Sequence, residues 1–344
     1  MSKALKNLLI LCLCAAMALG VLTACNRGEG ATEPSNSAAT EPAEEARVLK
    51  VLTLGHSLAV DSCHMINLVC GAEGVGDYDE VVIGTLYYSG CRLSQHVDFM
   101  TANSPEYRLY LSSSATPGKP PEGMDSVTMY DALRYDYWDV IVMQGNPWEI
   151  DADAGFTSGN IQKIQTYVNE NKTNPLAIFA WHMPWAMPAD ESLLKTYPKE
   201  PNSHYINYQA YGMDKTAHYE AQVGCVERYI LTDDTFSFVI PTGTTIQNAW
   251  SSYLEEADLH RDYAHATDLG RVMAAYTWYC RLMGIEQLTE IKLDAIPQAF
   301  LKSTEDKTQD RPLTEAEKVI ILESVNNALK EPMKMTQSQY TEAP

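Results

Sequence analysis

Three residue types stand at places in the chain where together they could perform nucleophilic catalysis. Ser57 comes shortly after the apolar run 48–54, and Asp262 and His265 form a D-x-x-H segment just before the helix-like stretch 267–283. A serine hydroxyl is a weak nucleophile at neutral pH. It needs a histidine to take its proton and an acid to orient the imidazole. We therefore assign Ser57, His265 and Asp262 as nucleophile, base and acid of an ester-cleaving site.

Each of these residues also has an ordinary structural interpretation. Ser57 could cap the N-terminus of a helix, Asp262 could be a turn residue, and His265 could be a polar loop residue. The combination favours catalysis, because one short segment supplies both acid and base while the serine comes from the other end of the domain.

The elements that must position these residues follow from the hydrophobic pattern. Five apolar runs are typical of buried strands: 48–54, 81–86, 139–143, 176–181 and 236–240. Helical spacing recurs between and after them, at 62–72, 129–135, 161–171, 211–231 and 267–283. The alternation predicts an α/β fold in three layers, a doubly wound parallel sheet of about five strands with helices on both faces. Ligands of such sheets bind beyond the carboxyl ends of the strands.

The order of these blocks resembles the SGNH (GDSL-type) hydrolase superfamily. The resemblance implies a flavodoxin-like fold and an acyl-enzyme mechanism carried by Ser57, His265 and Asp262. It further implies an oxyanion hole formed by the backbone N–H groups of Ser57 and Gly90 with the side-chain amide of Asn146. The scattered His and Asp residues lack the ligand spacing of a metal site, so we expect neither a metal nor a cofactor.

A closer resemblance is to the SGNH-like family called domain of unknown function 4886, from about Val48 to Gly284. It rests on these segments: Gly55-His56-Ser57-Leu58-Ala59-Val60-Asp61, Ser89-Gly90-Cys91-Arg92-Leu93-Ser94-Gln95-His96, Trp138-Asp139-Val140-Ile141, His182-Met183-Pro184-Trp185-Ala186, and Ile240-Pro241-Thr242-Gly243-Thr244 with Gln247-Asn248.

Two positions depart from the superfamily pattern. His56 replaces the usual Asp or Asn before the serine, and Gln144 replaces a glycine seen in many of these enzymes. We expect His56, Gln144, His182 and Trp185 to border the substrate cleft. The departures also motivate an alternative function, a non-catalytic carbohydrate- or ligand-binding lipoprotein on an SGNH scaffold.

The N-terminal segment has the features of an export signal. Lys3 and Lys6 precede an apolar run at 8–21, which is shorter than a membrane-spanning helix needs. Leu22-Thr23-Ala24-Cys25 resembles a bacterial lipoprotein box, which implies cleavage after residue 24 and acyl chains on Cys25 that hold the protein to a membrane. The domains expected are a signal at 1–24, an acylated cysteine with a disordered tether at 25–46, a hydrolase domain at 47–285, and a C-terminal helical extension at 286–344.

The net charge of the chain limits which classes of molecule it can bind. Asp and Glu number 45 against 25 Lys and Arg, a net charge of -20, and removing the signal takes two lysines and leaves -22. Such a protein is repelled by nucleic-acid phosphates, which excludes nucleic acid as a partner class. A small ester or an acylated neutral glycan is the favoured substrate.

Five cysteines remain beyond the signal and the anchor, namely Cys63, Cys70, Cys91, Cys225 and Cys280. None is part of a CxxC motif, and the sequence leaves open whether one disulfide forms among them or none.

We expect a surface-tethered serine esterase that deacylates a glycan or a similar small ester, with acetyl as the expected acyl group. Transfer of the acyl group to an acceptor sugar is left open. The stretches 104–125 and 184–208 are expected to be loops that set specificity.

Overall fold

The computed structural model describes residues 46–147, 154–194 and 214–343, all within one compact unit, Glu45–Pro344. The expected signal, Cys25 and nearly all of the tether lie outside the described residues, as does much of the stretch 184–208. Within the described ranges, no helix is long and apolar enough to cross a membrane.

A seven-stranded sheet forms the centre of the described chain, in the order β4-β3-β2-β1-β5-β6-β7. Its strands are β1 (Val48–Gly55), β2 (Glu80–Tyr87), β3 (Tyr107–Ser113), β4 (Glu122–Val127), β5 (Val140–Gln144), β6 (Ile178–His182) and β7 (Phe236–Ile240). β1, β2, β5, β6 and β7 pair in parallel, which confirms the five predicted strands and the α/β class. β5 is buried along its whole length, as expected for a strand covered on both faces.

The parallel strands follow the flavodoxin-like spatial order, with the first strand between the second and the third. Chain direction across the sheet therefore reverses between β1 and β5. Such a switch point opens a crevice at the carboxyl ends of the two strands, which is where α/β proteins bind ligands. Ser57 follows β1 directly and Asn146 follows β5, so the topology brings both to this crevice.

The prediction of a loop at 104–125 is wrong. This stretch holds β3 and most of β4, which extend the sheet by antiparallel pairing to β2 and to each other. β4 is almost entirely exposed and has the sequence Glu-Gly-Met-Asp-Ser-Val, which lacks the apolar pattern of a buried strand. Pairing with β3 rather than local propensity makes it a strand, and its exposed Glu122 and Asp125 protect the sheet edge from further pairing.

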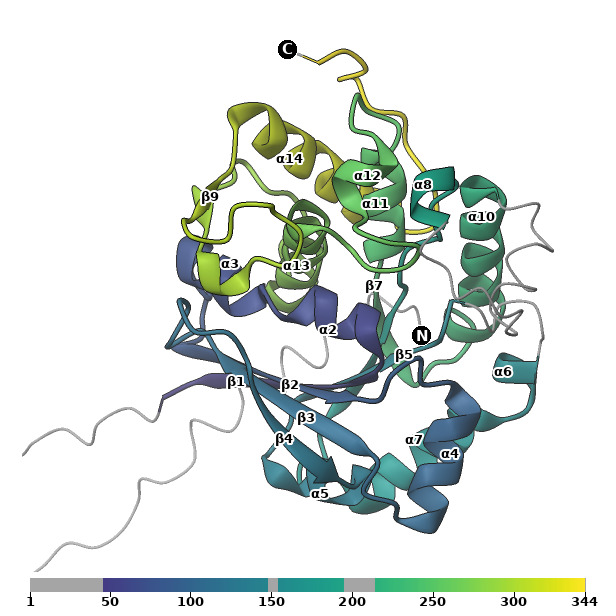
Figure 1. Ribbon diagram of the computed structural model, residues 1–344. Coiled ribbons are helices and arrows are strands. Elements are labelled where there is room, and N and C mark those ends of the chain that lie inside the picture. The colour runs from purple at the N-terminus through teal and green to yellow at the C-terminus, as the bar shows by residue number, and fades with distance from the viewer. Residues whose placement is uncertain (1–45, 148–153, 195–213, 344) are drawn as a thin grey trace, which may run out of the picture. The chain divides into compact units, whose positions relative to one another are not determined.

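Helices cover both faces of the sheet (Figure 1). On one face lie α2 (Ser57–Cys63), α3 (Ile66–Glu73), α11 (Thr242–Ala249), α13 (Asp268–Met283) and α14 (Glu315–Lys330), and on the other lie α4 (Leu93–Ala102), α5 (Met129–Tyr135) and α7 (Asn160–Asn171). The remaining helical segments are α6 (Ala154–Thr157), α8 (Glu191–Leu194), α10 (Lys215–Cys225), a π-helical turn at Val226–Ile230, α12 (Glu256–Leu259) and a 3-10 turn at Gln298–Phe300. The three layers confirm the predicted doubly wound architecture.

The single helix expected at 62–72 is two helices, α2 and α3, and the first of them begins at Ser57. The C-terminal region also folds onto the layers. Thr314 and Glu317 form a capping box, in which each side chain accepts the other residue's backbone N–H. The following helix α14 packs against α11 and α13, and a short hairpin of β8 (Ala295–Ile296) and β9 (Arg311–Pro312) precedes it.

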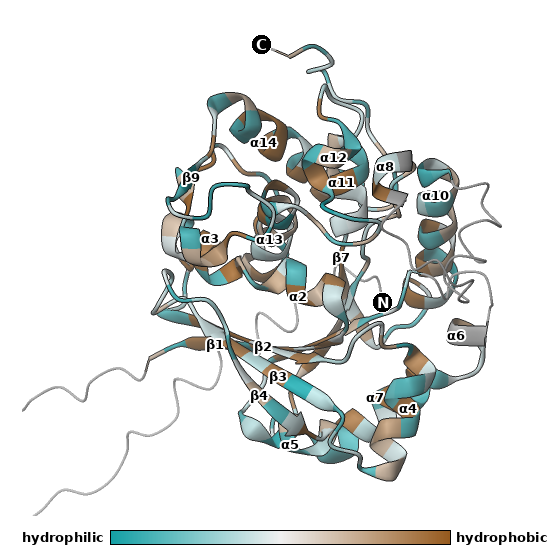
Figure 2. Ribbon diagram, viewed as in Figure 1, coloured by the Kyte–Doolittle hydropathy of each residue, from teal (hydrophilic) through white to brown (hydrophobic). Residues whose placement is uncertain are grey.

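Close packing between strands and helices sets the core. In Figure 2 brown and teal alternate along helices such as α4 and α14, as expected for helices that bury one face. Trp138, which is fully buried, lies against β2, where a Cβ added at Gly84 would come within 2.7 Å of its ring and 3.2 Å of Leu52. The strand can hold only glycine there without repacking.

We predict that Gly84→Ala lowers the free energy of unfolding by about 1–3 kcal/mol, because the added methyl group overpacks the core against Trp138. Chemical denaturation measures the change. Gly118→Ala is the matched control, since nothing lies within 4 Å of a Cβ at that position. Equal stability of the two variants contradicts the packing argument.

Candidate active site

The serine stands at a sharp turn from strand to helix. β1 ends at Gly55, His56 caps α2, and Ser57 is the first residue of that helix. A Cβ at Gly55 would approach Gln144 Oε1 to 2.7 Å and the Ala59 side chain to 2.8 Å, so only glycine permits this tight passage. The turn leaves Ser57 partly exposed while both residues before it are buried.

The aspartate folds its own loop around the histidine. Asp262 Oδ1 accepts the backbone N–H groups of Ala264 and His265, both at 2.8 Å. The same carboxylate reaches His265 Nδ1 with Oδ1 at 3.0 Å and Oδ2 at 2.9 Å. The turn that orders the backbone therefore also fixes the imidazole, as the three-residue spacing predicts.

The carboxylate keeps its charge under ordinary conditions. Burial alone would raise the pKa of Asp262, but the hydrogen bonds from the His265 ring and backbone outweigh it and lower the pKa to about 2. An ionised carboxylate only accepts hydrogen bonds, so Nδ1 of His265 carries the hydrogen. In the neutral imidazole, Nε2 then has an open lone pair, which is the tautomer that a general base needs.

Ser57 and His265 line one cleft of about 530 Å³. Its described lining comes from four places in the fold: the start of α2, the loop after β2, the start of α4 and the loop before α13. The lining residues are Ser57, Tyr88, Ser89, Gly90, Arg92, Ser94, Gln95, Tyr263 and His265. Among the described residues no hydrogen bond joins Ser57 to His265, a contact that in such sites often tightens only when substrate binds.

The two other residues expected at the oxyanion hole lie in contact with each other. Gly90 lines the cleft and has a backbone φ of +58°, a left-handed conformation that favours glycine. Asn146 is buried behind it and donates from Nδ2 to the Gly90 carbonyl at 2.8 Å. Asn146 thus ties the end of β5 to the loop after β2 and holds the Gly90 peptide in place. Donation from its side-chain amide to an oxyanion stays a prediction.

His56, Gln144, His182 and Trp185 do not border the cleft, which corrects our expectation. At most 1% of each residue is exposed, because they pack beneath the strand ends. Gln144 Oε1 accepts the His56 backbone N–H at 3.1 Å, and Gln144 Nε2 lies 2.9 Å from His182 Nδ1. The His56 ring accepts the Leu58 N–H at 3.4 Å, which gives it the helix-capping role that Asp or Asn usually has.

The buried network fixes the state of His182. Since the Gln144 amide donates to Nδ1, the hydrogen of the neutral ring lies on Nε2, which is 2.7 Å from Thr242 Oγ1. Burial, aided by nearby His56, holds the pKa of His182 well below its ordinary value, so the ring stays neutral. His182 thus joins the ends of β5 and β6 to the start of α11 and has a structural role.

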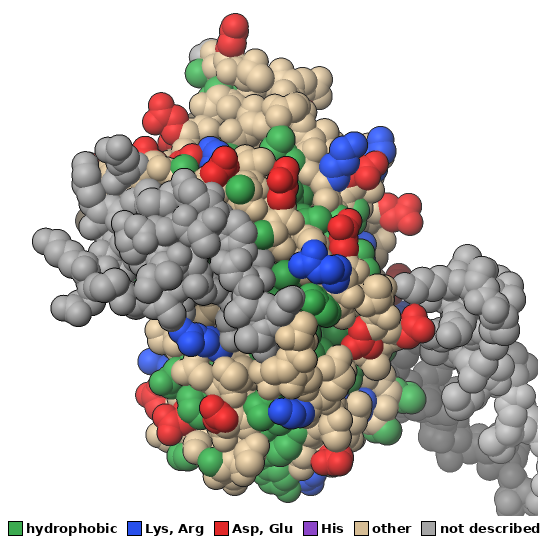
Figure 3. Space-filling model, turned by 90° about the vertical axis from the view of Figure 1, so that its right-hand side faces the viewer, with side chains coloured by type: hydrophobic (Ala, Val, Ile, Leu, Met, Phe, Trp, Pro, Cys, Tyr) green, Lys and Arg blue, Asp and Glu red, His purple; other side chains and the backbone are tan. Residues whose placement is uncertain are grey.

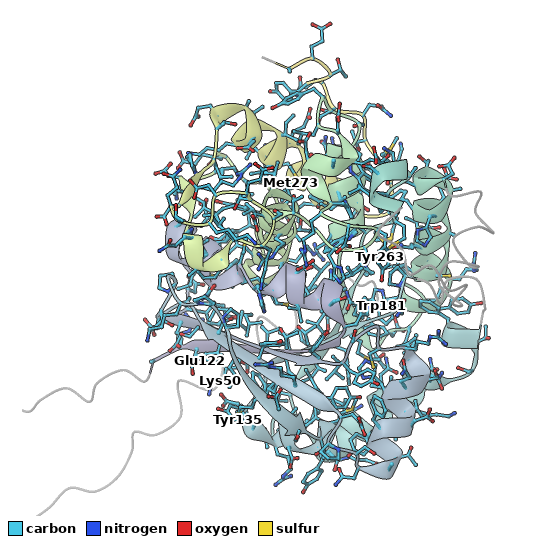
Figure 4. The ribbon with its side chains drawn as sticks, in the orientation of Figure 1. Lys50, Glu122, Tyr135, Trp181, Tyr263 and Met273 are labelled. Carbon is cyan, nitrogen blue, oxygen red and sulfur yellow. The ribbon has the colours of Figure 1, made fainter. Side chains whose placement is uncertain are left out.

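Trp185 supports the acid–base loop from below. Its indole Nε1–H donates to the carbonyl of Ala264, the residue before His265, at 2.8 Å. In Figure 4, Tyr263 of this loop lies toward the same side as Trp181 near the end of β6, and Lys50 near the start of β1 lies at the opposite side. The loop therefore lies at the carboxyl edge of the sheet.

Tyr88, Arg92 and Tyr263 line the cleft although sequence reasoning did not single them out as site residues. All three lie within or beside the segments that carry the family resemblance, so their position in the sequence was the signal that could have identified them.

The described part of the chain holds no cluster of His, Cys, Asp and Glu that could bind a metal. The five cysteines are buried and form no disulfide. On the face shown in Figure 3, Lys and Arg side chains are interspersed with Asp and Glu side chains.

We predict a pH-dependent stability difference between the wild type and Asp262→Asn. The folded pKa of Asp262 is lowered, so its stabilisation is present above the unfolded value near 4 and is lost as pH falls toward about 2. At pH 6 the free energy of unfolding of the variant should be about 1–2 kcal/mol lower than that of the wild type. At pH 2.5 most of that gap should have closed.

Denaturant titrations at the two pH values measure this gap. Asp77→Asn is the control, since Asp77 is exposed and should show no gap at either pH. If Asp262→Asn lowers the free energy of unfolding as much at pH 2.5 as at pH 6, the lowered pKa of Asp262 is contradicted.

Comparison with solved structures supports the fold. A crystal structure of a protein of the domain of unknown function 4886 family from Bacteroides uniformis superposes with a TM-score of 0.67 at 22% identity, covering 86% of this chain and 100% of that one. At this identity the likeness speaks for the fold alone.

Two further structures are more distant. A candidate SGNH hydrolase from Slackia heliotrinireducens gives a TM-score of 0.40 at 15% identity, covering 68% of this chain and 98% of that one. A catalytic mutant of an acetylxylan esterase from Geobacillus stearothermophilus gives 0.36 at 12% identity, covering 69% and 94%. Likenesses of this strength carry no argument about activity.

No curated protein matches the sequence. The family model of domain of unknown function 4886 matches residues 50–296, which span most of the chain and include every residue of the proposed triad and oxyanion hole. The chain belongs to the domain of unknown function 4886 family.

Proposed function

We propose that this protein is a serine ester hydrolase with Ser57 as nucleophile, His265 as general base and Asp262 as the orienting acid. The observation that carries the proposal is the pair of contacts from both Asp262 carboxylate oxygens to His265 Nδ1, at 2.9 and 3.0 Å, in a cleft that Ser57 also lines. These are the groups that convert a weak hydroxyl nucleophile into an active one.

The chemistry proceeds in two steps. Ser57 Oγ attacks the ester carbonyl carbon as His265 Nε2 takes its proton, and the oxyanion is stabilised by the backbone N–H groups of Ser57 and Gly90. The bond to the alcohol then breaks, and His265 returns the proton to the leaving oxygen. Water, which gives a proton to His265 Nε2, attacks the acyl carbon. The bond from that carbon to Ser57 Oγ then breaks, the acid is released, and His265 passes the proton to Ser57 Oγ. Asn146 supports this site through the Gly90 carbonyl.

The lining of the cleft favours a sugar as leaving alcohol. Ser89 and Ser94 supply hydroxyl groups, and Tyr88 and Tyr263 supply flat rings on which a sugar can stack. Within the described lining there is no aliphatic side chain to solvate a long acyl chain. We therefore infer that the substrate is a glycan carrying a short acyl group such as acetyl. We also propose export and membrane anchoring through Cys25, on the strength of the N-terminal sequence.

A non-catalytic ligand-binding protein is the alternative function. The two departures that motivated it, His56 and Gln144, have a structural explanation, since they cap α2 and bridge β5 to β6 from within the core. Neither residue displaces a group from the cleft. The geometry therefore favours the enzyme.

We predict that the purified protein hydrolyses p-nitrophenyl acetate and that Ser57→Ala lowers kcat by roughly 1000-fold or more, because no other group supplies the acyl acceptor. Release of p-nitrophenol measures the rate. Ser89→Ala is the matched control: Ser89 lines the same cleft, but p-nitrophenyl acetate has no sugar for its hydroxyl to bind, so turnover should stay near the wild-type value. Unchanged turnover in Ser57→Ala would show that Ser57 is not the nucleophile.

We further predict that the wild type releases acetate from an acetylated xylo-oligosaccharide faster than it releases butyrate from the matched butyrylated sugar, because the described lining holds no aliphatic side chain to pack against a longer chain. Chromatography of the products also detects any transfer to an added acceptor sugar. Binding of the sugar by calorimetry without release of acid, in the wild type and Ser57→Ala alike, supports the ligand-binding alternative.

A further inference from the structure

Ser57 and His265 lie far apart in sequence, so some contact must set their spacing. Asp61 lies one helical turn after Ser57 on α2, and residues four apart share a face of a helix. Only 4% of Asp61 is exposed, although it carries a carboxylate. A buried carboxylate needs partners, and those of Asp61 come from the loop that holds Asp262 and His265.

The two partners flank the acid–base pair on both sides. Asp61 Oδ2 accepts the backbone N–H of Ala266 at 3.0 Å, immediately after His265. Both Asp61 oxygens accept hydrogen bonds of 3.2 to 3.3 Å from the guanidinium of Arg261, the residue immediately before Asp262. A forked arrangement of this kind restricts orientation as well as distance.

The loop between these two points is closed on itself. His260 and Ala266 form an antiparallel bridge, and the Arg261 N–H donates to the His265 carbonyl at 2.9 Å. The Arg261 guanidinium also donates to the Ala266 carbonyl. A loop braced in this way moves as a unit, so its attachment to α2 determines where the His265 ring lies relative to Ser57.

A second cation completes the site around Asp61. Arg271 of α13 has a fully buried side chain, and its Nε lies 3.7 Å from Asp61 Oδ1. Arg271 is itself held by the Phe300 carbonyl at 2.7 Å and by Asp268 at 3.4 Å. The negative charge of Asp61 thus lies between two guanidinium groups, and its neutralisation would leave both with one partner fewer.

We propose that Asp61 is a positioning residue that holds the Asp262–His265 loop at working distance from Ser57. The inference rests on the proposed esterase function for its kinetic consequence, and on the contacts above for its structural one. Asp61 does not line the cleft, so it acts through the loop and not on substrate. Misplacement of reacting groups by about 1 Å can lower a rate by about 100-fold.

The experiment compares Asp61→Asn with Glu73→Gln in the full chain. The Glu73 side chain is 5% exposed and accepts the Tyr276 hydroxyl and the Lys292 N–H, both at 2.7 Å, away from the loop. Both substitutions remove one buried charge at constant size. We expect Asp61→Asn to lower kcat for p-nitrophenyl acetate by about 10- to 100-fold with KM little changed, and Glu73→Gln to leave kcat near the wild-type value.

Hydrogen exchange of the amides at 262–266 gives a readout that does not depend on activity. Asp61→Asn should speed exchange there by about tenfold or more, since a charged hydrogen bond is lost, and Glu73→Gln should not. If Asp61→Asn does not fold, Arg261→Gln tests the same attachment, because it removes the guanidinium and leaves Arg271 in place.

The outcomes separate the two proposals. A wild type without esterase activity refutes the proposed function, and the exchange rates then decide the positioning role alone. Exchange at 262–266 that is as slow in Asp61→Asn and Arg261→Gln as in Glu73→Gln overturns the positioning role. An equal loss of kcat in Asp61→Asn and Glu73→Gln, with Ser57→Ala inactive, also overturns it and leaves the esterase intact.

Discussion

The contact between the Asp262 carboxylate and the His265 imidazole is the interaction on which the site depends. A single carboxylate folds the loop through two backbone N–H groups and orients the ring through Nδ1. Its charge persists because these bonds outweigh the cost of partial burial. The ring orientation and the tautomer both follow from this one side chain.

Much of the remaining polar core serves to hold that contact against the sheet. Trp185 supports the loop through the Ala264 carbonyl, and Asp61 attaches it to the helix that begins with Ser57. On the other side of the cleft, Asn146 holds the Gly90 peptide. Buried hydrogen bonds between side chains at the strand ends, centred on Gln144, fix the neighbouring backbone. Buried hydrogen bonds of this kind add rigidity, which catalysis by positioned groups requires.

The sequence predicted the parallel strands well, because long apolar runs such as 139–143 report burial on both faces directly. It did not predict β3 and β4, whose order comes from antiparallel pairing at the sheet edge and not from their own pattern. The D-x-x-H geometry was predictable because it is local. Whether His56, Gln144 and His182 face the cleft or the core depends on side-chain direction at the strand ends, which spacing along the chain does not specify.

The central claim is that Ser57 and His265 act as one chemical unit. Treatment with a fluorophosphonate, followed by intact-mass measurement and peptide mapping, tests it most directly, because such probes react with a serine only when a base activates it. We expect one adduct per chain, located on Ser57, in the wild type and a much slower reaction in His265→Ala. An adduct that forms equally fast in His265→Ala, or no adduct in a folded wild type, would contradict it.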